Sequence, residues 1–140
     1  MKKLTLILLC IVHCVLCIDV VAQTRHMAEH LFNIENYEDA YKVYVKLMET
    51  YPKDYLLKYQ AGRCLFELEL YDEALPLFEK AVQKNVVKAN RFLGDIYFYQ
   101  YRFEDAAEAY SAYIASLDVE QDSLINIYKQ KIAKTDLGIN

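Results

Sequence analysis

Three side chains near the start of the chain have the types and the spacing of a metal site. His26, Glu29 and His30 form an H-x-x-E-H run. Two histidines four residues apart share one face of a helix, so both imidazoles could bind one zinc ion. A glutamate between them could then act as a general base toward a metal-bound water. Taken alone, this run would describe a small zinc-dependent hydrolase.

A complete zinc site needs a third ligand, and the sequence offers none in a matching context. The remaining histidine, His13, lies in an apolar segment that has the character of a cleaved signal. The ligand would therefore have to be a carboxylate, and no acidic pair stands at a suitable place. A chance match in a polar helix explains the run as well. We predict no catalytic residue, no metal and no cofactor, and we keep zinc hydrolysis as the alternative function.

Pairs of adjacent acids recur at three places: Glu38-Asp39, Asp72-Glu73 and Glu104-Asp105. Such pairs could be mistaken for acid–base dyads. Each pair opens a predicted helix, where carboxylates are stabilised by the positive end of the helix dipole by a few tenths of a kcal/mol. The chain also has no glycine-rich phosphate loop and no nucleophile elbow. The acids therefore predict helix starts and not catalysis.

The segments that carry these acids are near-copies of one another. After one variable first residue, segments 36–44, 70–78 and 102–110 all read aromatic, two acids, alanine, three variable residues, aromatic. Their alanines, Ala40, Ala74 and Ala106, are 34 and then 32 residues apart. A fixed period of this size indicates stacked repeats. Helical spacing on both sides of short breaks near residues 33–36, 69–70 and 101–102 predicts a helix-turn-helix in each repeat.

Small residues mark where the two helices of each repeat should cross. Ala28, Gly62 and Gly94 fall in the middle of the first helices, where a glycine costs about 1 kcal/mol relative to alanine. Such a cost is understandable if the second helix passes closely at that point. The recurring alanines of the second helices, Ala40, Ala74 and Ala106, would be the matching small residues. The sequence therefore predicts close crossings filled in by the neighbouring aromatic side chains.

This pattern resembles the tetratricopeptide repeat family, in a bacterial exported form. The residues that carry the resemblance are Ala28/Gly62/Gly94, Tyr37/Tyr71/Phe103, Ala40/Ala74/Ala106, Tyr44/Phe78/Tyr110 and Leu47/Ala81/Tyr113. The resemblance implies an all-α, right-handed helical solenoid with three repeats at residues 23–53, 55–86 and 87–118. An amphipathic segment at 119–140 would close the stack as a capping helix with its tail. Proteins of this family act as non-catalytic scaffolds for protein binding.

The first 22 residues have the layout of a secretory signal peptide. Lys2 and Lys3 precede an apolar run over residues 4–18, and cleavage is predicted after Ala22. The run is shorter than the roughly 20 apolar residues of a membrane span, so we prefer a cleaved signal and keep an uncleaved membrane anchor as the alternative. The mature chain would be periplasmic or secreted, with no membrane span. Of four cysteines it would keep Cys64 alone, which we expect to be a small buried hydrophobe.

The resemblance places a binding groove on the concave side, along the first helices. The residues that would line it are Arg25, Glu29, Phe32, Tyr59, Arg63, Phe66, Lys88, Arg91, Phe92, Asp95, Phe98 and Tyr99. Aromatic surface with four basic residues suits an extended or helical peptide with apolar anchors and a carboxylate. Some of the phenylalanines could instead fill contacts between repeats. A net charge of −4 gives no case for nucleic acid, and self-association through the groove stays open.

A carboxylate clamp, by which some members of the family hold a peptide C-terminus, is not predicted here. The equivalent positions carry Arg25, Glu29, Gln60, Lys88 and Phe92. Only the two basic ends fit the lysine–asparagine–arginine pattern of that clamp. The sequence therefore gives no reason to expect that the groove holds a peptide C-terminus in this way.

Overall fold

The computed structural model describes residues 21–117 and 121–137. All regular elements in this part of the chain are helices, and the predicted all-α solenoid is confirmed. The predicted signal peptide lies almost wholly outside the described residues. Residues 118–120, where the third predicted repeat meets the predicted cap, and residues 138–140 of its tail also lie outside them. No helix within the described ranges is both long and apolar enough to cross a bilayer.

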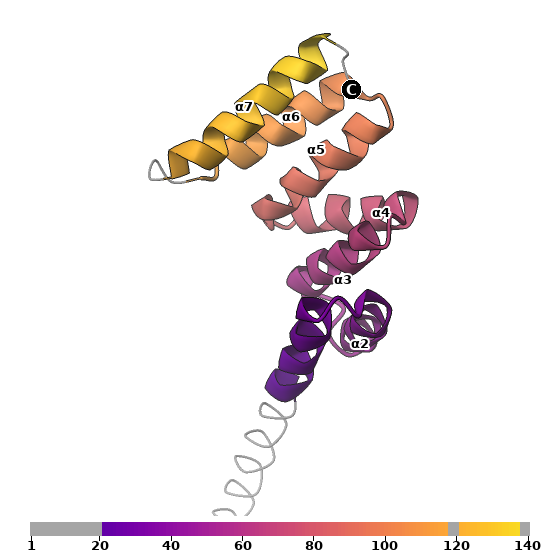
Figure 1. Ribbon diagram of the computed structural model, residues 1–140. Helices are drawn as coiled ribbons and strands as arrows, with labels where there is room; N and C mark the ends of the chain where they lie inside the picture. The colour runs from indigo at the N-terminus through magenta and orange to yellow at the C-terminus, as the bar shows by residue number, and fades with distance from the viewer. Residues whose placement is uncertain (1–20, 118–120, 138–140) are drawn as a thin grey trace, which may run out of the picture.

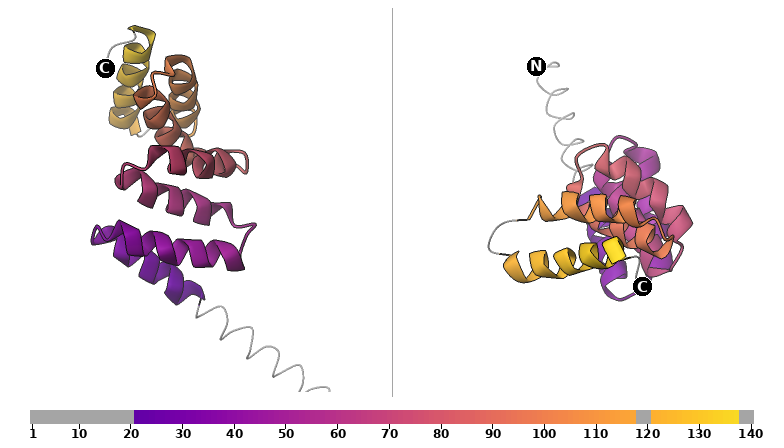
Figure 2. Two further views of the ribbon diagram at one scale, coloured as in Figure 1. Left: turned by 90° about the vertical axis from the view of Figure 1, so that its right-hand side faces the viewer. Right: turned by 90° about the horizontal axis from the view of Figure 1, so that it is seen from above.

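Helical hairpins stack one on another into an elongated solenoid (Figure 1). Residues 21–33 form the first helix, which pairs with α2. The remaining elements are α2 (Tyr37–Thr50), α3 (Tyr55–Glu67), α4 (Tyr71–Val82), the short 3-10 turn η1 (Val87–Ala89), α5 (Asn90–Tyr99), α6 (Phe103–Ile114) and α7 (Asp122–Leu137). The side view in Figure 2 shows the hairpins as successive layers along one axis. The first helix, α3 and α5 thus open the three repeats, and α2, α4 and α6 complete them.

Each repeat turns between its helices through a residue with positive φ. These residues are Glu35 at 62°, Glu69 at 60° and Tyr101 at 59°. The amide that follows the first of them, on Asn36, donates to the carbonyl of Leu31 at 2.9 Å. This bond closes a C-terminal helix cap in which glycine is the usual residue, because only glycine adopts positive φ without strain. The turns fall where the sequence predicts them, but with bulky residues at the strained position.

The paired acids lie at the starts of the second helices, as the sequence predicts. Glu38 and Asp39 are in the first turn of α2, and the other two pairs open α4 and α6 in the same way. The Asn36 side chain also accepts a hydrogen bond from the Asp39 amide at 3.4 Å. The cap of α2 is thus the Asn36 side chain, and the paired carboxylates lie in the first turns, near the positive end of each helix dipole.

Glycine is required at the two crossings that the sequence singles out. A Cβ atom built on Gly62 would lie 2.9 Å from Cε1 of Phe78, and one on Gly94 would lie 2.4 Å from Cδ1 of Tyr110. Real Cβ atoms do not approach ring carbons this closely. In both repeats the large ring of the second helix rests directly on the backbone of the first, so the predicted close crossings are confirmed.

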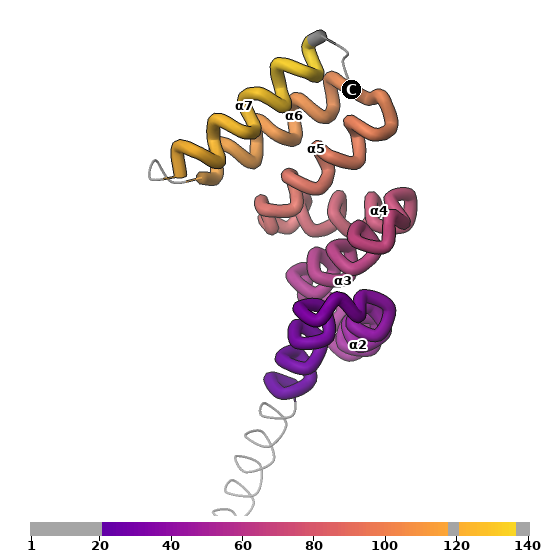
Figure 3. Tube along the Cα trace, viewed as in Figure 1, coloured from indigo at the N-terminus to yellow at the C-terminus, as the bar shows by residue number. Residues whose placement is uncertain are grey.

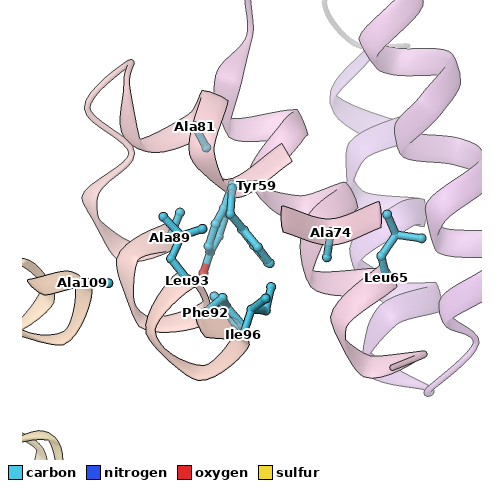
Figure 4. Packing of buried hydrophobic residues seen from close by; sticks show 10 residues of the cluster. Tyr59, Leu65, Ala74, Ala81, Ala89, Phe92, Leu93, Ile96 and Ala109 are labelled. Carbon is cyan, nitrogen blue, oxygen red and sulfur yellow. The ribbon is translucent and has the colours of Figure 1, made fainter. Parts of the chain in front are cut away.

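The central core lies between the second and third repeats (Figure 4). It gathers Tyr59, Leu65, Phe92 and Ile96, and Phe92 stacks on Phe78 with ring centroids 4.9 Å apart and planes within 5°. Aromatic stacking of this kind adds to the free energy gained from burial. The hydrophobic core is therefore continuous across the boundary between the second and third repeats.

Cys64 lies in the neighbouring core cluster of the first and second repeats, where it is fully buried. Burial raises the pKa of its thiol to about 12. The thiolate is the reactive form of cysteine, so this residue acts as a small hydrophobe at neutral pH, as the sequence predicts.

The last helix, α7, lies along α6 and covers the end of the third repeat (Figure 3). Tyr128 is buried there, and its ring centroid lies 5.0 Å from that of Tyr113 and 5.6 Å from that of Tyr110. Tyr128 stands 34 residues after Gly94, which is one further repeat period. The helix predicted as a cap therefore occupies the position that the first helix of a fourth repeat would take.

Candidate protein-binding surface

The predicted groove residues form one connected surface on the first helices, here called the first-helix surface. Arg25, Glu29 and Phe32 lie on the helix of residues 21–33, and the others lie on α3, η1 and α5. Direct contacts join neighbouring repeats across this surface. The guanidinium of Arg63 on α3, for example, lies 4.0 Å from the ring centroid of Phe32. The structure thus brings the predicted residues together, although not all of them face solvent.

A polar network holds the first repeat to α3. The Glu29 carboxylate accepts a hydrogen bond from the Tyr44 hydroxyl at 2.9 Å and another from the Gln60 amide at 3.1 Å. Arg63 adds an ion pair with Glu29 at 3.6 Å. Burial, and then the Glu29 hydrogen bond, raise the pKa of Tyr44, so its hydroxyl stays protonated and donating. Glu29 is therefore engaged in joining repeats.

The third repeat repeats this arrangement with Asp95. Its carboxylate accepts from the Tyr110 hydroxyl at 2.7 Å and from the Lys131 ammonium on α7. Burial, followed by the charge of Asp95, raises the pKa of Tyr110. Lys131 also lies over the rings of Tyr110 and Tyr128, at 5.3 and 5.2 Å from their centroids. Asp95 thus ties α5, α6 and α7 together.

The second repeat changes both members of this pair at once. Arg63 stands where the other repeats have an acid, and Phe78 stands where they have a tyrosine. An acid at this position accompanies a tyrosine hydroxyl 15 residues later, as for Glu29 with Tyr44. A comparison of the three repeats could have found this correlation in the sequence. It was missed because each acid was assigned to the groove by its helix face alone.

Most of the predicted groove aromatics are packed against other rings. Three of them reach across the hairpin turn to the first aromatic of the next helix: Phe32 to Tyr37 at 5.1 Å, Phe66 to Tyr71 at 5.3 Å and Phe98 to Phe103 at 5.5 Å. Tyr59 and Phe92 are 8% and 3% exposed and belong to the core. Of the six predicted aromatics, Tyr99 alone is largely exposed, at 56%. Phe92 therefore fills a contact between repeats, as the alternative interpretation of the phenylalanines predicts, and does not line an open groove.

Two cations in the middle of the surface have no acidic partner in the described part of the chain. Arg25 pairs with Asp54 at 2.7 Å, and Arg63 pairs with Glu29. Lys88 instead lies 5.0 Å from the ring centroid of Tyr59, and the guanidinium of Arg91 lies 4.4 Å from that of Phe92. Their positive charges are uncompensated, so this region favours an acidic ligand even though the whole chain is acidic.

The histidine pair is not assembled into a metal centre. His26 and His30 are both exposed on the first helix, while Glu29 between them is bonded to Tyr44 and Gln60. No group of three histidine, cysteine or carboxylate side chains lies close enough to hold a metal anywhere in the described residues. The two imidazoles could chelate an added metal weakly, without a water-activating base in position.

Purified protein is expected to contain far less than one zinc per chain. The physical reason is that two exposed histidines supply only half of a tetrahedral site. Elemental analysis by mass spectrometry after dialysis measures the zinc content, with His13→Ala as the matched control where the full chain is used. Stoichiometric zinc that disappears in His26→Ala or His30→Ala would restore the hydrolase hypothesis.

A stack of helical hairpins with small residues at the crossings and a variable first-helix surface defines a helical repeat protein. The sequence profile of the tetratricopeptide repeat matches residues 27–86 and again 71–119. The chain belongs to the tetratricopeptide repeat family, as its sequence predicts. No curated protein matches it in sequence.

Several solved structures share this fold. One of them is PcrH from Pseudomonas aeruginosa, which has been solved alone and in complex with the chaperone binding region of PopD. The PcrH chain of that complex matches with a TM-score of 0.74 and 15% identity, over 85% of this chain and 92% of that one. The type III secretion translocator chaperone SycD of Yersinia enterocolitica gives 0.75 and 18%, over 85% of each chain. MamA from Desulfovibrio magneticus gives 0.64 and 24%, over 82% and 69%. Because the sequence identities are this low, the structural similarity shows a common fold alone.

Proposed function

We propose that this protein is a non-catalytic interaction module that binds a segment of a protein partner on its first-helix surface. Membership of the tetratricopeptide repeat family supports this. PcrH, which is similar in fold, is known in complex with the chaperone binding region of another protein. The observation that carries the proposal is the pair of uncompensated cations, Lys88 and Arg91, on the same surface as the exposed ring of Tyr99. The partner segment is therefore acidic, with apolar side chains on either side of the charge.

We also propose that binding takes place after export, in the periplasm or outside the cell. The N-terminal layout of two lysines, an apolar run and small residues up to Ala22 supports this. The mature chain would then begin at Gln23 and would still contain all of the first-helix surface. Its partner would be found among exported proteins.

Reversing the two uncompensated charges is expected to abolish capture of the partner. Residues 23–140 serve as bait for the envelope and secreted fractions of the native cell. Lys88→Glu with Arg91→Glu is expected to weaken binding at least about tenfold, which corresponds to about 1.4 kcal/mol. Arg63→Glu is less suitable, because it would place a second acid beside Glu29 and disturb the fold.

The matched control is Lys46→Glu with Lys80→Glu, which makes the same charge change at exposed positions of α2 and α4. It is expected to bind like the unchanged protein. Equal capture by both double variants would contradict the proposed surface, and capture from cytoplasmic fractions alone would contradict export. Light scattering that shows a dimer dissociated by Lys88→Glu with Arg91→Glu would assign the surface to self-association instead.

A further inference from the structure

A small cavity lies at the C-terminal end of the first-helix surface, between α5 and α7. Its volume is about 150 Å³, and its lining residues are Asp95, Phe98, Tyr99, Tyr110, Lys131 and Lys134. A cavity of this size holds about one benzene ring. Two of its lining residues, Lys131 and Lys134, come from the helix that the sequence presents as a mere cap. The cavity is formed because α7 occupies the position that the first helix of a fourth repeat would take.

The aromatic walls of the cavity are already fixed in place. Phe98 packs edge-on against Phe103, and Tyr99 stacks on Tyr71 with centroids 5.2 Å apart and planes 27° from parallel. Tyr99 nonetheless remains 56% exposed, so a large part of this side chain is open to a ligand. A preformed wall loses little conformational entropy on binding, which favours tight recognition of a single side chain.

The charges around the cavity leave an excess of one positive charge. Asp95 is 13% exposed, and its carboxylate is already neutralised by Lys131 and bonded to the Tyr110 hydroxyl. Lys134 is exposed and makes no ion pair with any residue in the described ranges. An anion at the mouth would therefore be attracted by Lys134, while a cation would be repelled.

We propose that this cavity receives one aromatic side chain of the partner segment, with a carboxylate next to that ring held by Lys134. The cavity volume sets the size of the guest, and the faces and edges of Phe98 and Tyr99 suit an aromatic ring. Lys131, which already lies over two tyrosine rings, would contribute a cation–π contact to a third. This assignment rests on the proposed function, since it specifies which feature of the partner the surface recognises.

Small probes test the cavity without knowledge of the partner. The mature protein, labelled with nitrogen-15, is titrated with 3-phenylpropionate, 3-phenylpropylamine and hexanoate, and amide shifts are followed by NMR. We expect 3-phenylpropionate to shift the amides of Tyr99 and Lys131 saturably, with a dissociation constant on the order of 1–5 mM. The amine, which carries the ring with the opposite charge, and hexanoate, which carries the charge without a ring, should each bind at least about fivefold more weakly.

Two variants connect the binding to the cavity. Lys134→Glu is expected to weaken 3-phenylpropionate binding at least about tenfold, whereas Lys129→Glu, on the same helix but outside the cavity, should leave it unchanged. Tyr99→Ala removes one wall and should also weaken binding, and thermal unfolding of each variant verifies that the fold is intact. Binding of hexanoate as tight as that of 3-phenylpropionate would overturn the aromatic guest, and equal binding of the amine would overturn the role of Lys134.

The two proposals fail in different ways. If no probe shifts the amides of Tyr99 and Lys131, while partner capture still depends on Lys88 and Arg91, the cavity assignment is wrong and the proposed function stands. If 3-phenylpropionate binds as expected but no partner segment is captured through Lys88 and Arg91, the cavity is a ring-and-carboxylate site and the proposed function is wrong.

Discussion

Gly94→Ala is expected to lower the free energy of unfolding by about 1–3 kcal/mol, as overfilling of a packed core usually does. The added Cβ would lie 2.4 Å from ring carbons of Tyr110. That ring cannot move aside freely, because its hydroxyl is bonded to Asp95 at 2.7 Å. In an unobstructed helix the same substitution would raise stability by about 1 kcal/mol. The sign of the change in the free energy of unfolding therefore distinguishes a glycine at a close helix crossing from a glycine in an unobstructed helix.

Chemical denaturation followed by circular dichroism measures this difference. Gly62→Ala is the natural comparison, since its Cβ would lie 2.9 Å from Phe78, whose ring has no hydroxyl to anchor it; we expect a smaller loss there. Tyr110→Phe releases the anchored ring, so Gly94→Ala should cost less in that background than alone. A stabilised Gly94→Ala protein would show that the helices of the third repeat do not cross as described.

Removal of residues 121–140 is expected to destabilise the protein by roughly 3 kcal/mol or more, the usual effect of removing one large buried aromatic side chain. The deletion takes away Tyr128 and uncovers Tyr110 and Tyr113 on α6. It also leaves the largely buried Asp95 carboxylate without Lys131, and a buried charge that loses its partner is unfavourable. The third repeat should then unfold at a lower temperature than the first two and aggregate.

Thermal unfolding and size-exclusion chromatography measure both effects. Removal of residues 138–140 alone provides the control, because it leaves α7 (Asp122–Leu137) whole. Tyr128→Ala separates the packing contribution from the loss of the whole helix. A shortened chain that melts like the complete one and stays monomeric would mean that α7 does not stabilise the stack.

Much of the fold was predictable, because it depends on spacing along single helices. The period of Ala40, Ala74 and Ala106 located the hairpins, and Gly62 and Gly94 located the crossings. The helix face of a residue follows from its position in the 3.6-residue repeat. The family follows from the same small residues, and the match of the repeat profile confirms it.

The candidate site was less predictable, because it depends on how one hairpin sits on the next. Helix position placed Phe92 and Tyr99 on the same surface, yet the first is 3% exposed and the second 56%. Contacts such as Glu29 with Gln60, 31 residues apart, and Asp95 with Lys131, 36 residues apart, depend on the offset between repeats. That offset is a property of the packed stack and has no signature in any single helix.

The bonds of the Glu29 and Asp95 carboxylates impose an order on folding. Chains fold as they emerge, with N-terminal parts generally first. The Glu29 network can close once α3 is present, since its partners Gln60 and Arg63 lie there. Asp95 must wait for Lys131, which lies 36 residues later on α7. The third repeat therefore stays uncovered until α7 is available, and a chain that lacks α7 displays the Asp95 carboxylate without its lysine beside exposed aromatic rings.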